Sequence, residues 1–188
     1  ELLKSQRLNG NYAQLIHYMN LDNKLVETDH KKQGPSKVVM AYDGVIKSFG
    51  SGELVLDKAL NKITFTQSKV SDRLVISDVN LNQATLIFRG VTPLKSLEPN
   101  SVRYDRNGLT GCLSIMDSTV TSANFYVENG GCEDAVNFIR VKGSIAVLSV
   151  SNSASDAIDM DFSAIHVDSV FVEDAENDCI DVSGGTYT

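Results

Sequence analysis

Aspartate residues that recur every 22 positions are the side chains of this 188-residue sequence best suited to chemistry. If the segments that carry them stack, equivalent carboxylates lie about 4.8 Å apart, and their repulsion must be offset by a cation or by hydrogen-bond donors. The set consists of two aligned series and one neighbour: Asp134, Asp156 and Asp178; Asn137, Asp159 and Asp181; and Asp161.

Three uses of these residues are open at this point. Asp and Asn side chains can accept hydrogen bonds from backbone N–H groups in turns, which is a purely structural role. Alternatively, oxygen ligands from neighbouring segments could hold calcium, with Asp134, Asp156 and Asp178 as the ligands; no other cofactor is required. The third use is a carbohydrate site, with Asp156 and Asp178 as candidate catalytic carboxylates and the remaining four residues as the binding surface: Asn137, Asp159, Asp161 and Asp181.

The spacing of the apolar residues predicts the elements that position these aspartates. Each 22-residue copy contains short β-branched runs interrupted by Asn, Asp, Ser and Gly, without a stretch of helical periodicity. This pattern predicts an all-β fold, a right-handed parallel β-helix of about seven coils. Side chains alternate along a strand, so Val136, Ile158 and Ile180 are expected to point inward. The matching positions are Ile145 with Val167, Leu148 with Val170, Val150 with Val172, and the turn residues Asn152 with Asp174.

The rest of the chain is expected to complete a single domain, residues 1–188. Residues 10–20 have the pattern of a short helix that would cap the first coil. Residues 92–110 hold two of the three prolines and predict a loop excursion, and residues 111–188 form the regular coils. Because no capping element follows the third copy, either the chain is cut short or a partner covers the last coil, for example a second copy stacked on it as a homo-oligomer.

Charge divides the chain in two. Residues 1–106 carry 15 basic and 11 acidic side chains, whereas residues 107–188 carry only Arg140 and Lys142 against 13 acids. A net charge of -7 argues against nucleic acid as a partner, since a basic stripe is needed to displace counterions. No apolar run is long enough to span a membrane.

The three cysteines are expected to be reduced and buried as small apolar fillers. Cys112 and Cys179 fall in one column, but three coils apart, about 14 Å, which exceeds the reach of a disulfide. Cys132 is expected on the other side of a turn. No Cys-x-x-Cys spacing occurs in the sequence, which argues against structural zinc.

The stretch from Cys132 to Tyr187 resembles bacterial right-handed parallel β-helix repeat proteins of poorly defined function. The segments Ser155–Asp159 and Asn177–Ile180 are also similar to motifs of polygalacturonases and related pectin hydrolases, which implies Asp156 and Asp178 as catalytic carboxylates. The Gly-His-Gly of those enzymes does not occur, and Asn177 replaces one of their paired acids. β-Helix polysaccharide lyases, such as pectate lyases, combine a basic residue with an acidic cation site, roles that Arg140 or Lys142 could fill beside Asp134.

These observations favour a non-catalytic β-helix scaffold or binding module for a carbohydrate or another protein. A carbohydrate-active enzyme, either a lyase or a polygalacturonase-like glycosidase, and a structural homo-oligomer are the alternatives. Reduced cysteines would be compatible with the cytoplasm, whereas the resemblance is compatible with a secreted or cell-envelope protein.

Overall fold

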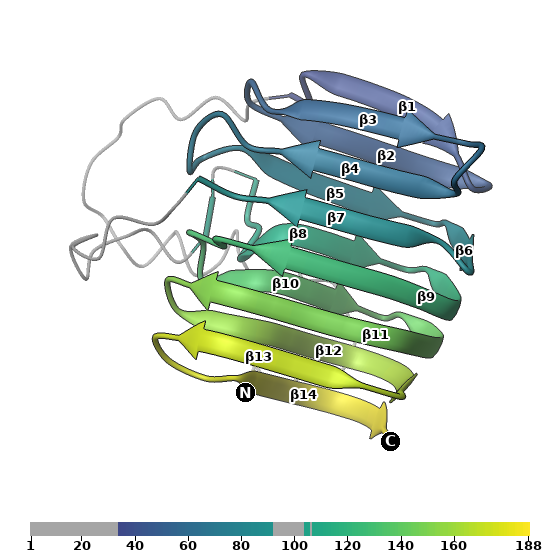
Figure 1. The fold of residues 1–188 in the computed structure, drawn as a ribbon, viewed down its shortest axis with the longest axis vertical. Helices are drawn as coiled ribbons and strands as arrows, with labels where there is room; N and C mark the ends of the chain where they lie inside the picture. The colour runs from purple at the N-terminus through teal and green to yellow at the C-terminus, as the bar shows by residue number, and fades with distance from the viewer. Residues whose placement is uncertain (1–33, 92–103, 106) are drawn as a thin grey trace, which may run out of the picture.

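The computed structural model describes residues 34–91, 104–105 and 107–188, which fold as a β-solenoid of about five turns (Figure 1). The predicted cap helix at residues 10–20 lies outside the described residues, and the described residues contain no helix. Five turns are fewer than the seven predicted for the whole chain. The strands are β1 (Lys37–Ala41), β2 (Gly44–Phe49), β3 (Glu53–Asp57), β4 (Lys62–Thr66), β5 (Arg73–Ser77), β6 (Asn80–Asn82), β7 (Thr85–Arg89), β8 (Gly111–Met116), β9 (Thr119–Glu128), β10 (Asp134–Ile139), β11 (Lys142–Ser153), β12 (Asp156–Val167), β13 (Val170–Ala175) and β14 (Ile180–Tyr187).

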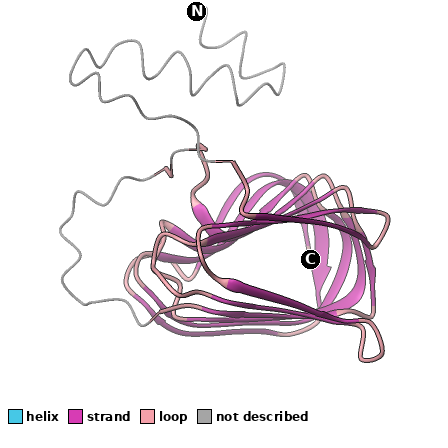
Figure 2. Cartoon of the chain, turned by 90° about the horizontal axis from the view of Figure 1, so that it is seen from above, coloured by secondary structure: helices cyan, strands magenta, loops and turns pink. Residues whose placement is uncertain are grey.

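Each regular coil contributes to three faces, because the longer strands bend from one face to the next. Face A contains β2, β5, β8 and β10 and the first parts of β12 and β14. Face B is short and contains β6, the first parts of β9 and β11, and the second parts of β12 and β14. Face C contains β3, β4, β7, the second parts of β9 and β11, and β13. Seen along the stack, the strands surround one continuous core (Figure 2).

The 22-residue register predicted from the sequence is confirmed. Val136 pairs with Ile158, and Ile158 pairs with Ile180. On face C, Leu148 pairs with Val170. The coil that begins at Gly111 is one residue longer, since Gly111 pairs with Asp134. The regular part of the chain is therefore a stack of equivalent coils.

Apolar side chains from all three faces fill the interior. Phe65 and Phe88 lie 5.6 Å apart between ring centroids, and Phe125 meets Phe138 edge to face at 5.2 Å. All four rings are fully buried. Aromatic contacts of this kind add to the free energy of burial, and each ties one coil to the next or one face to another.

Left-handed backbone conformations end the strands of face C at one equivalent corner. Asn129, Asn152 and Asp174 have φ values of 58°, 56° and 57°. Asn and Asp tolerate this conformation better than other non-glycine residues. The Asn152 amide also donates a 2.6 Å hydrogen bond to Asn129 Oδ1 in the preceding coil. The turn role predicted for Asn152 and Asp174 is confirmed by this geometry.

The N-terminal end of the solenoid departs from parallel pairing. β1 pairs antiparallel with β2, β2 with β5, and β3 with β4. Tyr42 and Asp43 connect β1 to β2 with φ values of 56° and 64°, the geometry of a tight two-residue hairpin. A two-residue connection is too short for a crossover between parallel strands. The parallel coils predicted for this region therefore begin only at β4 and β5.

The prediction of three reduced cysteines is wrong. Cys112 and Cys132 form a disulfide with a Cα–Cα distance of 5.4 Å, and Cys179 is a free, exposed thiol. The prediction placed Cys132 across a turn from Cys112. Because Gly111 pairs with Asp134, Cys132 instead opens the adjacent coil beside Cys112. Because two of the three cysteines form a disulfide, the cysteines no longer support the expectation of a cytoplasmic location.

Candidate functional site

Face A contains the predicted column of Asn137, Asp159 and Asp181 and the first two members of the other, Asp134 and Asp156, whereas Asp178 lies in the turn before β14. Asp134 pairs with Asp156, and Asn137, Asp159 and Asp181 are successive partners across β10, β12 and β14. Asp161 pairs with Ile139 two residues further along β12. The columns differ sharply in exposure, since Asp134, Asn137 and Asp156 are buried while Asp178 and Asp181 are exposed. Each carboxylate must therefore be assessed by its own partners.

Asp156 has the structural role that was one of the three open uses. Its Oδ1 accepts hydrogen bonds from the Asn177 side-chain amide at 2.6 Å and from the Asp178 backbone N–H at 3.0 Å. These two bonds fasten the turn before β14 to the preceding coil. Of the candidate catalytic pair, Asp156 is thus occupied as a turn acceptor, and Asp178 contributes its backbone to that turn.

A compact acidic cluster lies on β10 and β12 of face A, and we call Asp134, Asn137, Asp159 and Asp161 the Asn137 cluster. The Asn137 amide nitrogen lies 3.2 Å from Asp134 Oδ2, 2.8 Å from Asp159 Oδ2 and 3.5 Å from Asp161 Oδ2. Thr110 Oγ1, at the end of the predicted loop excursion, lies 3.1 Å from the same nitrogen. Within residues 34–91, 104–105 and 107–188, no three His, Cys, Asp or Glu side chains by themselves form a group that could hold a metal ion.

Burial changes the ionisation of this cluster. The pKa of Asp159 is raised to about 8, first by burial and then by the negative charges of Asp134, Asp161 and Asp181. The pKa of Asp134 is raised to about 6, chiefly by burial, although hydrogen bonds to its carboxylate oppose the shift. Burial also raises the pKa of Asp161. The three carboxylates are thus held close together at a cost in electrostatic free energy.

The Arg140 side chain has a structural partner and does not take the role of proton acceptor that a lyase would require. Its guanidinium forms a two-pronged ion pair with Asp117, with nitrogen–oxygen distances of 2.6 and 2.7 Å. The side-chain hydrogen bond from Arg140 lowers the pKa of Asp117. A guanidinium fixed in this way is a structural link between coils rather than a poised proton acceptor.

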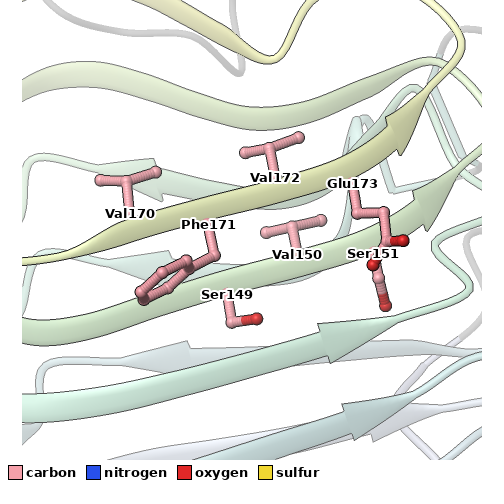
Figure 3. Close-up of a pocket in the computed structure, with 7 residues that line it drawn as sticks. All are labelled: Ser149, Val150, Ser151, Val170, Phe171, Val172 and Glu173. Atoms are coloured by element: carbon pink, nitrogen blue, oxygen red, sulfur yellow. The ribbon is translucent and has the colours of Figure 1, made fainter.

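A shallow groove on face C presents a different chemistry, and its residues are not among those predicted from the sequence. Seven residues on β11 and β13 line it: Ser149, Val150, Ser151, Val170, Phe171, Val172 and Glu173 (Figure 3). The Phe171 side chain is 60% exposed. It pairs in register with Ser149, and Ser149 pairs with Tyr126 of β9, which is 38% exposed. Two exposed aromatic side chains therefore flank one small hydroxyl residue.

Polar groups run beside this aromatic row. Glu128, Ser151 and Glu173 are successive register partners on the same three strands, two residues further along. We use the name face C groove for the seven lining residues together with Tyr126 and Glu128 of β9, which continue the two rows on the neighbouring strand. The combination offers apolar aromatic surface next to carboxylate and hydroxyl hydrogen-bonding groups.

The repeat alignment contains a signal for the groove. Tyr126 and Phe171 stand 23 residues before and 22 residues after Ser149 and occupy outward positions of their strands. An aromatic residue at an outward position is exposed rather than part of the core. Aligning the outward positions of face C in the same way as the aspartates would have found the row.

No protein-family model matches the chain, and no curated protein or solved structure shows a significant match to it. The fold and its surfaces define the class to which the chain belongs, a parallel β-solenoid with an acidic face A and an aromatic groove on face C. Of the resemblance to bacterial β-helix proteins, the coil fold is confirmed. The described residues contain no helix that could cross a membrane.

Proposed function

We propose that this β-solenoid is a non-catalytic binding module that holds a neutral carbohydrate in the face C groove. The observation that carries the proposal is the alignment of Tyr126, Ser149 and Phe171 across three neighbouring strands. Aromatic rings present flat π-faces, on which the C–H-bearing faces of sugar rings can stack. At the usual strand spacing the two aromatic positions lie roughly 9–10 Å apart, which suits an extended chain rather than one small sugar.

The polar row supports a neutral ligand. Glu128 and Glu173 can accept hydrogen bonds from sugar hydroxyl groups, and Ser151 can donate or accept. Their charge, within a half of the chain that carries 13 acids, would repel an acidic polysaccharide. The ligand class is therefore a neutral glycan that lies across the strands.

The contacts of the candidate catalytic residues favour binding over catalysis. Asp156 accepts two hydrogen bonds that hold a turn, and Arg140 is paired with Asp117. Neither contact leaves the group ready for proton transfer to a substrate. The enzyme alternative predicts reducing or unsaturated products from a polysaccharide, with turnover lost in Asp156→Asn.

An affinity screen tests the proposal. The protein is incubated with immobilised neutral polysaccharides and, separately, with acidic polysaccharides, and retention is compared between wild type and the double variant Tyr126→Ala/Phe171→Ala. Retention on a neutral glycan that the double variant loses is the expected result. Phe162→Ala is the matched control, since Phe162 is a 51% exposed aromatic residue outside the groove. Equal retention of wild type and double variant would refute the proposal.

Self-association through the last described coil is a second candidate, favoured by a specific observation. Ile180 and Val182 occupy inward positions of β14 but are 47% and 49% exposed. A second copy stacked on this surface would bury them and pair the free strand edges. Light scattering should then give a dimer that Val182→Glu converts to a monomer, and a wild-type monomer at all concentrations would exclude stacking.

A further inference from the structure

We infer that the ligand of the face C groove is an extended, unbranched neutral polysaccharide that lies along the solenoid axis and contacts all six strands of face C. The inference rests on the proposed carbohydrate function and deepens it, since it assigns the length and the shape of the chain that is bound. It extends the site from β9, β11 and β13 to β3, β4 and β7, which lie on the same face (Figure 1).

The first observation is that the aromatic row of the groove continues across the whole of face C. Tyr126 pairs in register with Ile87 of β7, Ile87 pairs with Thr64 of β4, and Thr64 pairs with Val55 of β3. The residues on either side of Thr64 and Ile87 in their strands are buried in the core, so these two side chains point outward. We call the six aligned residues the face C column: Val55, Thr64, Ile87, Tyr126, Ser149 and Phe171.

The second observation is that the face C column carries no charge, although charged side chains stand on both sides of it. The outward positions on one side are Glu53, Thr66, Arg89, Glu128, Ser151 and Glu173. Those on the other side are Asp57, Lys62, Thr85, Asn124 and Val147. An uncharged strip one residue wide therefore runs between two columns that consist mainly of hydrogen-bonding groups.

This arrangement fits a flat chain of sugar rings. In six-membered sugars joined through equatorial oxygens, the C–H groups lie on the two faces of each ring and the hydroxyl groups project from its edges. The ring faces can pack on the uncharged column, above all on Tyr126 and Phe171, while the hydroxyl groups on both edges reach the flanking polar side chains. A branch at either edge would meet those flanking side chains, so the column favours an unbranched chain.

The strand spacing sets the length of the ligand. Neighbouring positions of the face C column lie about 4.8 Å apart, so the six positions span about 24 Å. One ring of an extended, equatorially linked chain advances by nearly the same distance as one strand. Each ring therefore meets an equivalent position on the next strand, and about six rings fill the column. A shorter chain placed on Tyr126, Ser149 and Phe171 leaves the other three positions without contact.

Isothermal titration with β-linked cello-, manno- and xylo-oligosaccharides tests the inference, with the trisaccharide and the hexasaccharide of each compared. We expect a hexasaccharide to bind about tenfold or more tightly than its trisaccharide, because only the longer chain reaches Ile87, Thr64 and Val55. Val55→Lys and Thr64→Lys each place a charge in the column. Each should weaken hexasaccharide binding by about fivefold or more and leave trisaccharide binding within about twofold.

Leu60→Lys is the matched control for the two lysine variants. Leu60 is exposed and lies in the turn between β3 and β4, outside the face C column. The substitution introduces the same side chain close to Val55 in the sequence, and it should leave both affinities within about twofold. Thermal unfolding shows whether each variant is folded. Because Val55→Lys and Thr64→Lys are independent, misfolding of one leaves the other as the test.

Three results would overturn the inference. Equal affinity for a hexasaccharide and its trisaccharide, or hexasaccharide affinity that neither lysine variant changes, would do so and leave the proposed function intact. If no hexasaccharide binds, the inference is also wrong, and the affinity screen decides the proposed function separately through retention on another neutral glycan. A wild-type dimer in light scattering that Val55→Lys converts to a monomer would assign the face C column to contact between two copies instead.

Discussion

Two aspartates of the solenoid show how the surroundings decide what a carboxylate does. Asp72, just before β5, accepts hydrogen bonds from the backbone N–H groups of Ser51, Ser68 and Lys69 at 2.9–3.0 Å. Burial opposes ionisation there, but these donors prevail and lower its pKa. Asp159 accepts a hydrogen bond from the Asn137 amide, but burial, followed by the negative charges of neighbouring carboxylates, prevails and raises its pKa to about 8. A carboxylate surrounded by donors stabilises the fold, whereas one among other carboxylates requires a proton or a cation.

Replacing Asp72 with Asn tests this contrast through pH. A lowered folded-state pKa means that the ionised carboxylate stabilises the protein above its unfolded pKa and that this stability is lost as pH falls through the folded pKa. We therefore expect Asp72→Asn to lower the free energy of unfolding by about 1–3 kcal/mol at pH 7. The deficit should shrink towards pH 3. Denaturant unfolding at several pH values measures it.

Asp174→Asn is the control for that experiment. It places in one coil the residue that the preceding coil has at Asn152, in the same backbone conformation. Its stability at pH 7 should match that of wild type. A constant deficit for Asp72→Asn from pH 7 to pH 3 would contradict the assigned hydrogen-bonding role.

Local sequence spacing explains which of these residues could be predicted. The columns of Asp134, Asp156 and Asp159 follow from the 22-residue period, which the backbone register imposes on every coil. The role of Asp72 depends on Ser51, 21 residues away in the less regular N-terminal part. No repeat relates those two positions, so the sequence carried no signal for their contact.

At the scale of the coil, the close stacking of backbones sets where glycine is required. Gly143 in β11 has a φ of 120°, and a Cβ atom there would lie 1.9 Å from the Val120 carbonyl oxygen of β9. The same position is a register irregularity between these two strands. Both the backbone conformation and the lack of space therefore exclude a side chain.

Gly143→Ala should consequently destabilise the protein by about 2 kcal/mol or more. Thermal or denaturant unfolding measures the loss. Gly34→Ala provides a matched control, because a methyl group added at Gly34 would have no neighbouring atom within 4 Å. Equal stability of the two variants would show that β9 and β11 do not approach as closely as described.

The disulfide joins two consecutive coils and makes a separate prediction. Cys112 and Cys132 are separated by 20 residues in the sequence. Loop-closure entropy for a loop of that length gives an expected loss of about 3 kcal/mol in Cys112→Ala/Cys132→Ala. Cys179→Ser should have no such effect, because Cys179 is free and exposed.

Thiol titration provides the direct check. The native protein under non-reducing conditions should show one reactive thiol, and the Cys179→Ser variant none. Three accessible thiols after denaturation without reductant would contradict the disulfide and would restore the prediction made from the sequence.

The coil elements were predictable from the sequence where the period is strict and not where it breaks. From Gly111 onward, the alternation of apolar residues indicates both the strands and their register. The antiparallel start depends on a two-residue turn at Tyr42 and Asp43, which lacks the usual glycine of such turns. The disulfide was missed because column alignment compares equivalent positions, whereas Cys112 and Cys132 are one coil apart but at different positions in it.

For the whole molecule, stacking is what creates both candidate sites. The Asn137 cluster joins β10 to β12, and the face C groove lies on β11 and β13 and is continued by Tyr126 and Glu128 on β9. Neither site exists within a single coil, so no local motif could reveal it. The acidic half of the chain corresponds to these stacked coils. Some of its acidic residues accept hydrogen bonds in turns, as Asp156 does, and others lie together in the Asn137 cluster.

The central claim is that the face C groove binds a neutral glycan through its aromatic row. Isothermal titration of the oligosaccharide identified by the affinity screen, into wild type, Tyr126→Ala, Phe171→Ala and Phe162→Ala, tests it most directly. We predict that each groove variant binds about tenfold more weakly and that Phe162→Ala binds as wild type does, with all four proteins equally stable. Unchanged affinity in both groove variants would contradict the account.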